Sequence, residues 1–251
     1  MKHGLKDEFL KLWKKRFDGA ELPIAFYYTD DESVPGPAHP ADRCLIANLA
    51  GVREGTPMRF AEKSIGCPGG RRYTGFAEGL RPGFEFFLSC GIPGQMEGER
   101  YKKSPELVRE ILAKGPKFKA PAKYIVVKRW DRLEADEEPD VVVFFATPDV
   151  LSGLFTLASF DTAEPSGVIA PFSAGCGSIV LYPYLEKDKP DPHAVIGMFD
   201  PSARPHVPAA TLTFAVPMAK FVRMVGNMEE SFLITPTWET IRKRIVSALP
   251  Y

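Results

Sequence analysis

The sequence predicts an α+β protein, with a mixed sheet or sheets flanked by helices. Three observations predict this class. Short runs rich in β-branched and aromatic residues alternate with longer segments that repeat apolar residues every three or four positions. Gly supplies 21 of the 251 residues and Pro 24, which indicates many turns and short elements. The apolar fraction of 45% is ordinary for a globular chain, so the protein can bury a core.

The first expected elements are a helix, a strand and a second helix. The first helix covers residues 4–17, because its apolar residues form one stripe opposite several lysines. The strand follows over 23–28, a run of Ile, Ala, Phe and Tyr after a proline. A short helix of small and apolar residues is expected over 41–50, and Gly51 would then adopt the left-handed conformation that ends many helices.

Three later helices are expected where a hydroxyl residue precedes proline, at Ser104-Pro105, Thr147-Pro148 and Thr235-Pro236. The hydroxyl can accept a hydrogen bond from the first turn, and proline lacks a donor that this turn cannot use. The first of these helices ends near Lys114, and its apolar residues are expected to face inward: Leu107, Val108, Ile111 and Leu112. The remaining elements are a helix over 217–225 and strands over 124–129, 141–146, 178–182, 194–199, 211–216 and 231–235.

The chain is expected to form a single domain, residues 1–251, which could consist of two related halves, 18–120 and 138–235. Each half contains a strand, a helix and then a cysteine in a glycine-rich turn, Cys67 in the first half and Cys176 in the second. If this is a true duplication, a pseudo-twofold arrangement would bring the two cysteines to a shared interface. The alternative is coincidence, because both patterns are short and common.

Charge and cysteine content narrow the expected partners and compartment. Lys plus Arg equals Asp plus Glu, 32 of each, so the chain lacks the positive charge typical of nucleic-acid binding. The long uncharged segment 166–185 contains three Gly and two Pro and does not suit a membrane helix. The N-terminus carries acidic residues where an export signal would need an apolar stretch, so the four scattered cysteines are expected to be reduced thiols in the cytoplasm. The expected partners are a small molecule or another copy of the chain, with neither nucleic acid nor membrane.

The two glycine-rich turns are the candidate ligand-binding segments. Glycine allows backbone N–H groups to converge on an anion or a cofactor, and arginines after such a turn could bind phosphate or carboxylate. The alternative is an ordinary tight turn with solvated arginines. No P-loop or dinucleotide-binding pattern occurs in the chain. The candidate residues are Cys67, Gly69, Gly70, Arg71 and Arg72 in the first turn, and Gly175, Cys176 and Gly177 in the second.

The candidate metal ligands are Cys44, Cys67 and Cys176, which could hold a metal ion or an iron–sulfur cluster together with Cys90 or a histidine. No Cys-x-x-Cys pair supports this, and free cysteines are often small core residues. A nucleophilic pair of Cys67 with His39 or His206 requires that folding bring them together. In 200–204, an Asp and an Arg are expected to close a turn with an ion pair.

Several short motifs occur along most of the chain. They are Cys44, Cys67-Pro-Gly-Gly followed by Gly75, Ala174-Gly-Cys176, Asp200 with Arg204, and the segment that begins at Pro217. Together these motifs resemble the uncharacterised ArCR family, a bacterial and archaeal domain family without an assigned function. Near 209–211, where the family pattern leads us to expect an acidic residue, this chain has Ala-Ala-Thr. The resemblance implies a shared site around the three cysteines, but neither a substrate nor a cofactor.

These observations lead to one prediction of function and two alternatives. The prediction is a cytosolic protein that binds a small anionic molecule, or a thiolate-held cofactor, near Cys44, Cys67 and Cys176. The first alternative is an enzyme that uses Cys67 or Cys176 as a nucleophile or redox group. The second is a structural or subunit-interaction protein with no site.

Overall fold

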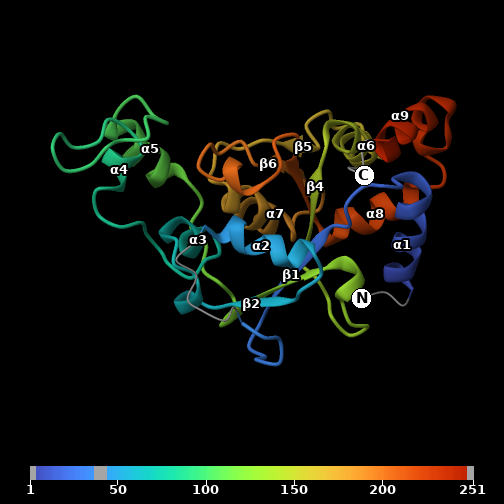
Figure 1. Ribbon diagram of the computed structural model, residues 1–251, viewed down its shortest axis with the longest axis horizontal. Coiled ribbons are helices and arrows are strands. Elements are labelled where there is room, and N and C mark those ends of the chain that lie inside the picture. Colours follow the sequence, from blue (N-terminus) through green and yellow to red (C-terminus); the bar gives the residue numbers. More distant parts are fainter. Residues whose placement is uncertain (1–3, 37–43, 248–251) are drawn as a thin grey trace.

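The fold is a seven-stranded mixed sheet with helices on both faces. Figure 1 shows its arrangement in a computed structural model, which describes residues 4–36 and 44–247. The strands lie in the order β2-β3-β1-β4-β7-β6-β5. Neighbours are antiparallel except β5 and β6, which are parallel. The predicted α+β class is therefore confirmed. The strands are β1 (Ile24–Thr29), β2 (Met58–Phe60), β3 (Tyr124–Arg129), β4 (Val141–Ala146), β5 (Val168–Ile169), β6 (Ala194–Gly197) and β7 (Leu212–Pro217).

Strand β4 lies at the centre of the sheet and separates two hydrophobic cores. All six of its residues are buried, because both faces of the strand are covered. Val142 and Phe144 point into the first core, whereas Val141 and Val143 point into the second. This alternation is the period of two that a strand imposes on its side chains.

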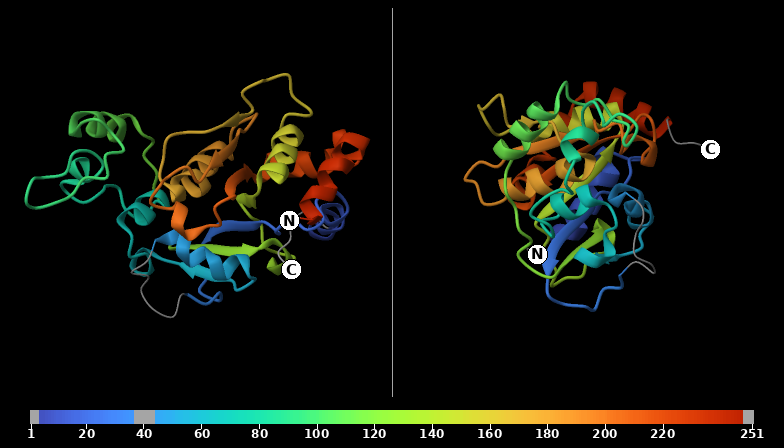
Figure 2. Two further views of the ribbon diagram at one scale, coloured as in Figure 1. Left: turned by 45° about the horizontal axis from the view of Figure 1, so that its top comes forward. Right: turned by 90° about the vertical axis from the view of Figure 1, so that its left-hand side faces the viewer.

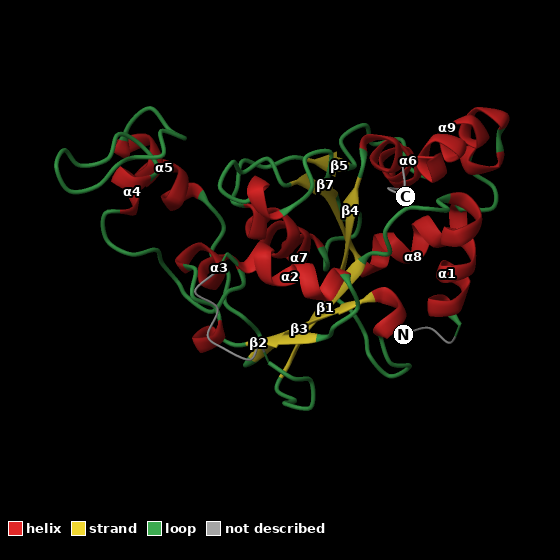
Figure 3. Ribbon diagram, in the orientation of Figure 1, coloured by secondary structure: helices red, strands yellow, loops and turns green. Residues whose placement is uncertain are grey.

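The first core is covered by α1 (Leu5–Arg16), α6 (Pro148–Ala158), α8 (Met218–Asn227) and α9 (Pro236–Ser247). Aromatic rings pack tightly here, and Trp13 stacks on Phe17 with ring centroids 4.4 Å apart. Gly153 of α6 lets that helix approach, because a Cβ at this position would stand 2.3 Å from Trp238 Cη2. Figure 3 shows these helices grouped on one side of the molecule.

The second core lies on the opposite face, beneath α2 (Leu45–Arg53), α3 (Pro68–Tyr73), the π-helix η3 (Gly177–Leu181) and α7 (Tyr182–Glu186). All five residues of η3 are buried. The elements that follow the three candidate cysteines therefore all pack on the same face of the sheet. The helices α2 and α6, which would correspond in a duplicated chain, lie on opposite faces. The relation between the two halves stays a prediction.

A helical arm projects from the body of the molecule. It contains α4 (Phe84–Phe87) and α5 (Pro105–Lys114), and it stands apart from the sheet in Figure 1 and in the left view of Figure 2. Within α5 only Val108 is buried, while Leu107 is 41% and Ile111 38% exposed. The expectation that the apolar residues of this helix all face inward is therefore wrong, because the arm lies away from the cores.

Most predicted elements appear within a few residues of their expected positions, with three exceptions. The segment 178–182 is helical rather than a strand, and 231–235 contains the 3₁₀ turn η5 (Phe232–Ile234) rather than a strand. Gly51 lies inside α2, and Gly55, with φ of 105°, adopts the left-handed conformation instead. In the described part of the chain, no helix is both long and apolar enough to cross a membrane.

Candidate functional site

Cys44, Cys67 and Cys176 come from separate segments and stand at the beginnings of three helices. Cys44 precedes α2, Cys67 precedes α3, and Cys176 precedes η3. At such positions backbone N–H groups lack partners within the helix, so their partial positive charge favours a thiolate or another anionic ligand.

Cys67 caps α3 through its sulfur. The N–H of Gly70 lies 3.5 Å from Cys67 Sγ and donates to it. Gly70 is buried between this turn and α2, since a Cβ at this position would stand 2.8 Å from Ile65 Cγ2 and 3.4 Å from Leu45 Cβ. Leu45 directly follows Cys44, so the absence of a side chain at Gly70 lets the two cysteine segments approach each other.

Cys176 is attached to the same region from the other side. A Cβ at Gly175 would stand 3.4 Å from Ile46 Cγ1, and a Cβ at Gly177 would stand 2.9 Å from Tyr73 Cδ1. The turn around Cys176 therefore touches both α2 and the end of α3. Cys67 and Cys44 are half-buried whereas Cys176 is buried, so Cys176 is the least accessible of the three thiols.

The thiols influence one another electrostatically. Burial raises the pKa of Cys176 well above its usual value, and the neighbouring Cys67, Cys44 and Asp200 add to this rise. Burial also raises the pKa of Cys44, against the effect of the backbone N–H groups of Ile46 and Ala47 at the start of α2. Cys176 and Cys44 are therefore protonated near neutral pH in the cofactor-free protein, and neither has the thiolate that a cysteine nucleophile needs.

Asp200 is the residue that sequence reasoning missed. It was expected to pair with Arg204, but its Oδ2 accepts a hydrogen bond from the N–H of Gly175 at 3.1 Å. Its Oδ1 accepts from the N–H and the hydroxyl of Ser202 at 3.0 and 2.8 Å. Arg204 instead donates to backbone carbonyls, including that of Pro208 at 3.4 Å. The turn is present, as the N–H of Arg204 donates to the carbonyl of Asp200, but the expected ion pair is not formed.

The arginines of the first turn are partly occupied by backbone carbonyls. Arg72 Nη1 donates to the carbonyl of Glu78 at 3.0 Å, and Arg71 Nη2 to that of Gly66 at 3.4 Å. These contacts agree with a structural role for both side chains. Neither side chain makes a described hydrogen bond to a thiol, and anion binding by Arg71 and Arg72 stays a prediction.

The histidines do not complete a cysteine pair in the described part of the chain. His193 Nδ1 lies 2.8 Å from Glu186 Oε2. His206 is exposed in the turn η4 (Arg204–His206), and no described contact joins it to a cysteine. His39 lies outside the described residues. Cys90 is exposed and follows α4 in the arm.

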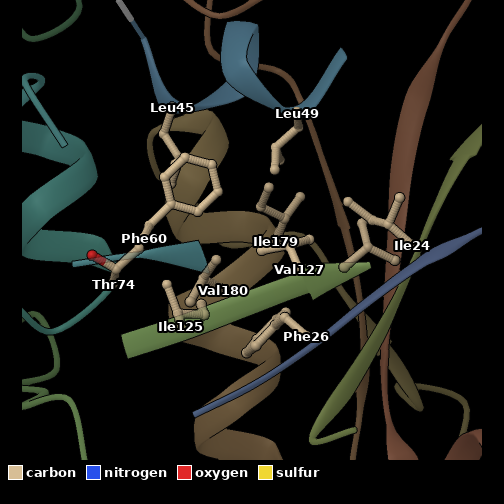
Figure 4. Close-up of a pocket in the computed structure, with 11 residues that line it drawn as sticks. Ile24, Phe26, Leu45, Leu49, Phe60, Thr74, Ile125, Val127, Ile179 and Val180 are labelled. Carbon is tan, nitrogen blue, oxygen red and sulfur yellow. The ribbon is translucent and has the colours of Figure 1, made fainter. Parts of the chain in front are cut away.

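The enclosed cavity next to this region is too small and too apolar to hold a ligand. Figure 4 shows it between α2, β1, β3 and η3, with Leu45 and Leu49 above Ile179 and Val180. Its volume is about 10 Å³ and nearly all of its wall is hydrocarbon. A space of this size and polarity stays dry. It is a packing defect of the second core, and a ligand of the cysteines would lie at the thiols themselves.

The geometry does not form a ready site for one metal ion. Within residues 4–36 and 44–247, no group of three or more His, Cys, Asp or Glu side chains is arranged around a single ion. The three cysteines share a region without converging on one point. Their role as metal ligands, and the ligand-binding role of the two glycine-rich turns, stay predictions.

Comparison with known proteins defines the family. The profile of a family described as Uncharacterised ArCR, a domain of unknown function, matches residues 15–227, which include all four cysteines and Asp200. No curated protein and no solved structure is similar enough to count as a match. The match covers most of the chain and agrees with the resemblance in the sequence motifs. The chain therefore belongs to the Uncharacterised ArCR family.

Proposed function

We propose that this protein binds a thiolate-held iron–sulfur cluster at Cys44, Cys67 and Cys176. The observation that carries the proposal is the meeting of three cysteine segments on one face of the sheet, through the contacts of Gly70, Gly175 and Gly177. Each iron of a cluster takes its own thiolate, so the sulfurs stand further apart than the ligands of a single ion.

The charges near the thiols favour a cationic core over a small anion. Asp200 is held beside Cys176 by the N–H of Gly175 and contributes to the raised pKa of both Cys176 and Cys44. A carboxylate in this position repels an anionic ligand and attracts a metal-containing one. Metal binding would displace the thiol protons, so a raised pKa in the cofactor-free protein is compatible with ligation.

The N-terminal ends of the helices would stabilise the ligating thiolates. Backbone N–H groups near Cys44 and the N–H of Gly70 near Cys67 point at sulfur. Hydrogen bonds to cluster sulfurs and partial positive charge at helix ends are among the ways in which proteins hold such cofactors. We also propose a cytoplasmic location, which the free cysteines support because disulfides are rare there.

Anaerobic purification, followed by reconstitution with ferrous iron and sulfide, tests the proposal. We expect broad visible absorption and comparable amounts of iron and acid-labile sulfide per chain. Cys67→Ser is expected to lose most of both, whereas Cys90→Ser, which alters the exposed cysteine of the arm, keeps them. Circular dichroism of the cofactor-free variants shows that each is folded. A colourless wild type that binds no iron after reconstitution would exclude the proposal.

The same preparation separates the enzyme alternative. Fast alkylation of Cys67 by iodoacetamide in a colourless protein, at a rate well above that of the exposed Cys90, would favour a nucleophilic cysteine. Four slowly reacting thiols without iron would favour a structural protein. The raised pKa values of Cys44 and Cys176 lead us to expect neither to react quickly.

A further inference from the structure

Backbone hydrogen bonds hold the projecting arm together internally. The N–H of Lys102 donates to the carbonyl of Leu88 at 3.0 Å, and the N–H of Arg100 donates to that of Ser89 at the same distance. Arg100 has φ of 56°, a left-handed conformation that is uncommon outside glycine and persists where the surroundings fix it. The segment before α5 is thus fastened to the residues after α4, and the arm, residues 77–119, is a single unit of structure.

The arm joins the body of the molecule through a narrow root. The carbonyl of Gly75, a residue with φ of 78°, accepts the N–H of Ala120 at 2.8 Å, so the segments that enter and leave the arm lie side by side. Phe118 fixes the root by packing against Tyr28 and Tyr184, with ring centroids 6.0 and 5.0 Å apart. A unit that is attached at one place can rotate about that place as a rigid body.

Beyond the root, two side-chain contacts join the arm to the body. Lys102 Nζ lies 3.6 Å from the centroid of the Phe172 ring, a cation–π contact, and Phe172 is otherwise 59% exposed. The neighbouring Tyr101 forms a hydrogen bond with Ser202 through its hydroxyl. Contacts of these two kinds are each weak near the surface, and together they favour the seated arm by roughly tenfold.

The two body residues that the arm contacts belong to segments that hold the turn around Cys176. Phe172 lies in the segment that runs from β5 into this turn. The hydroxyl of Ser202 donates to Asp200 Oδ1 at 2.8 Å, and Asp200 Oδ2 accepts the N–H of Gly175 at 3.1 Å. The arm therefore contacts the segment before Cys176 and, through Ser202, the carboxylate that fixes Gly175.

We propose that the arm is a hinged strap that holds the Cys176 turn in place. In the seated position, Lys102 and Tyr101 fasten the arm to both segments that support this turn. When the arm lifts about its root, the two contacts break together and the turn loses part of its support. The position of the arm and the order of the Cys176 turn are thus coupled, so a molecule that binds only the lifted arm loosens the turn.

Hydrogen–deuterium exchange, followed by mass spectrometry, tests this coupling. The experiment uses the cofactor-free protein, so its result does not depend on the proposed cluster. The variant combines Lys102→Met with Tyr101→Phe, which removes the ammonium group and the hydroxyl and keeps side chains of similar size. The control is Lys103→Met, which removes an exposed charge beside the same contacts. Peptides that cover 171–177 and 198–203 are expected to exchange up to about tenfold faster in the variant than in wild type and the control.

Exchange in strand β4 distinguishes local loosening of the turn from general instability. The amides of 141–146 are expected to stay protected in all three proteins. Equal exchange of 171–177 in the variant and in wild type would overturn the proposal, and so would the same acceleration in Lys103→Met. Acceleration in β4 as large as that in the turn would also overturn it, because the contacts would then support the whole fold. If the double variant does not fold, Tyr101→Phe alone, which removes one oxygen atom, decides by the same comparison.

Discussion

Replacement of Gly70 by alanine tests whether the cysteine segments are packed as described, because Gly70 lies between two of them. A Cβ at this position would stand 2.8 Å from Ile65 Cγ2 and 3.4 Å from Leu45 Cβ. Both neighbours are buried, and the Cβ of Leu45 is fixed to the backbone of α2. Relief requires α3 to move away from α2, which would carry Cys67 away from Cys44.

The magnitude follows from two opposing effects. Overpacking of a tight core costs about 1–3 kcal/mol. Alanine in place of a glycine within a helix stabilises the folded state by about 0.5–1 kcal/mol. The net expectation for Gly70→Ala is a loss of about 1 kcal/mol, which for a chain of this size corresponds to a fall in Tm of about 2–4 °C.

Gly69→Ala is the matched control, one residue away in the same helix. The nearest atom to a Cβ there is Cys67 Sγ at 3.8 Å, an ordinary contact, so this variant is expected to be as stable as wild type or slightly more stable. Thermal unfolding of both cofactor-free variants, followed by circular dichroism, measures the difference. Equal Tm values for Gly70→Ala and Gly69→Ala would refute the close packing of α3 against α2.

Three further predictions concern other parts of the molecule. In the folded, cofactor-free protein, iodoacetamide should modify the exposed Cys90 first and Cys176 only after unfolding. The reason is that burial both covers the thiol of Cys176 and raises its pKa. Mass spectrometry of samples taken at intervals measures the order of modification. Lys220→Met should stabilise the protein by about 1–3 kcal/mol near neutral pH, since Nζ is buried without a described hydrogen-bond partner. Desolvation lowers the pKa of Lys220 in the folded state, so the unfolded chain binds more protons and the stability of wild type rises with pH. In urea unfolding at several pH values, the stability advantage of the variant should therefore shrink as the pH approaches the ordinary lysine pKa. A difference in stability that stays constant with pH would contradict this account. Gly226→Ala, an exposed site in α8 with no neighbour within 4 Å of a Cβ, should raise stability by about 0.5–1 kcal/mol, and a loss would contradict the open environment.

The sequence alone predicted those helices and strands whose local pattern is typical of a single kind of element. Ser104 accepts the hydrogen bond expected of a helix cap, from the N–H of Leu107 at 3.4 Å, and Thr235 accepts one from Trp238 at the same distance. Residues 141–146 form the expected strand because β-branched and aromatic residues suit a strand buried on both faces.

The errors in the predicted elements have a common physical cause. Residues 177–181 are buried on all sides, so they lack the polar face that distinguishes a helix from a strand by its period. The apolar residues of α5 resemble those of any core helix, and only the long-range arrangement of the chain shows that the arm lies away from the cores. The spacing of apolar residues shows that a helix has an apolar face, but it does not show which part of the protein covers that face.

The sequence predicted the cysteines of the candidate site but not Asp200. The repeated cysteine turns pointed to Cys67 and Cys176, and the consideration of thiolate ligands for a metal or cluster added Cys44. Asp200 was not selected, because an Asp followed by Pro and Ser is typical of a turn and its partner Gly175 lies 25 residues away. The presence of Asp200 in the family motifs was the one signal that could have placed it at the site.

The most direct test of the central claim is the position of the four sulfur atoms. Crystals of the anaerobically purified protein, measured at a long wavelength, give anomalous peaks for sulfur and strong peaks for any bound iron. We expect the sulfurs of Cys44, Cys67 and Cys176 around one iron-containing centre with Asp200 beside it, and that of Cys90 apart. Three sulfurs that point away from one another into hydrocarbon, with no iron between them, would contradict the account.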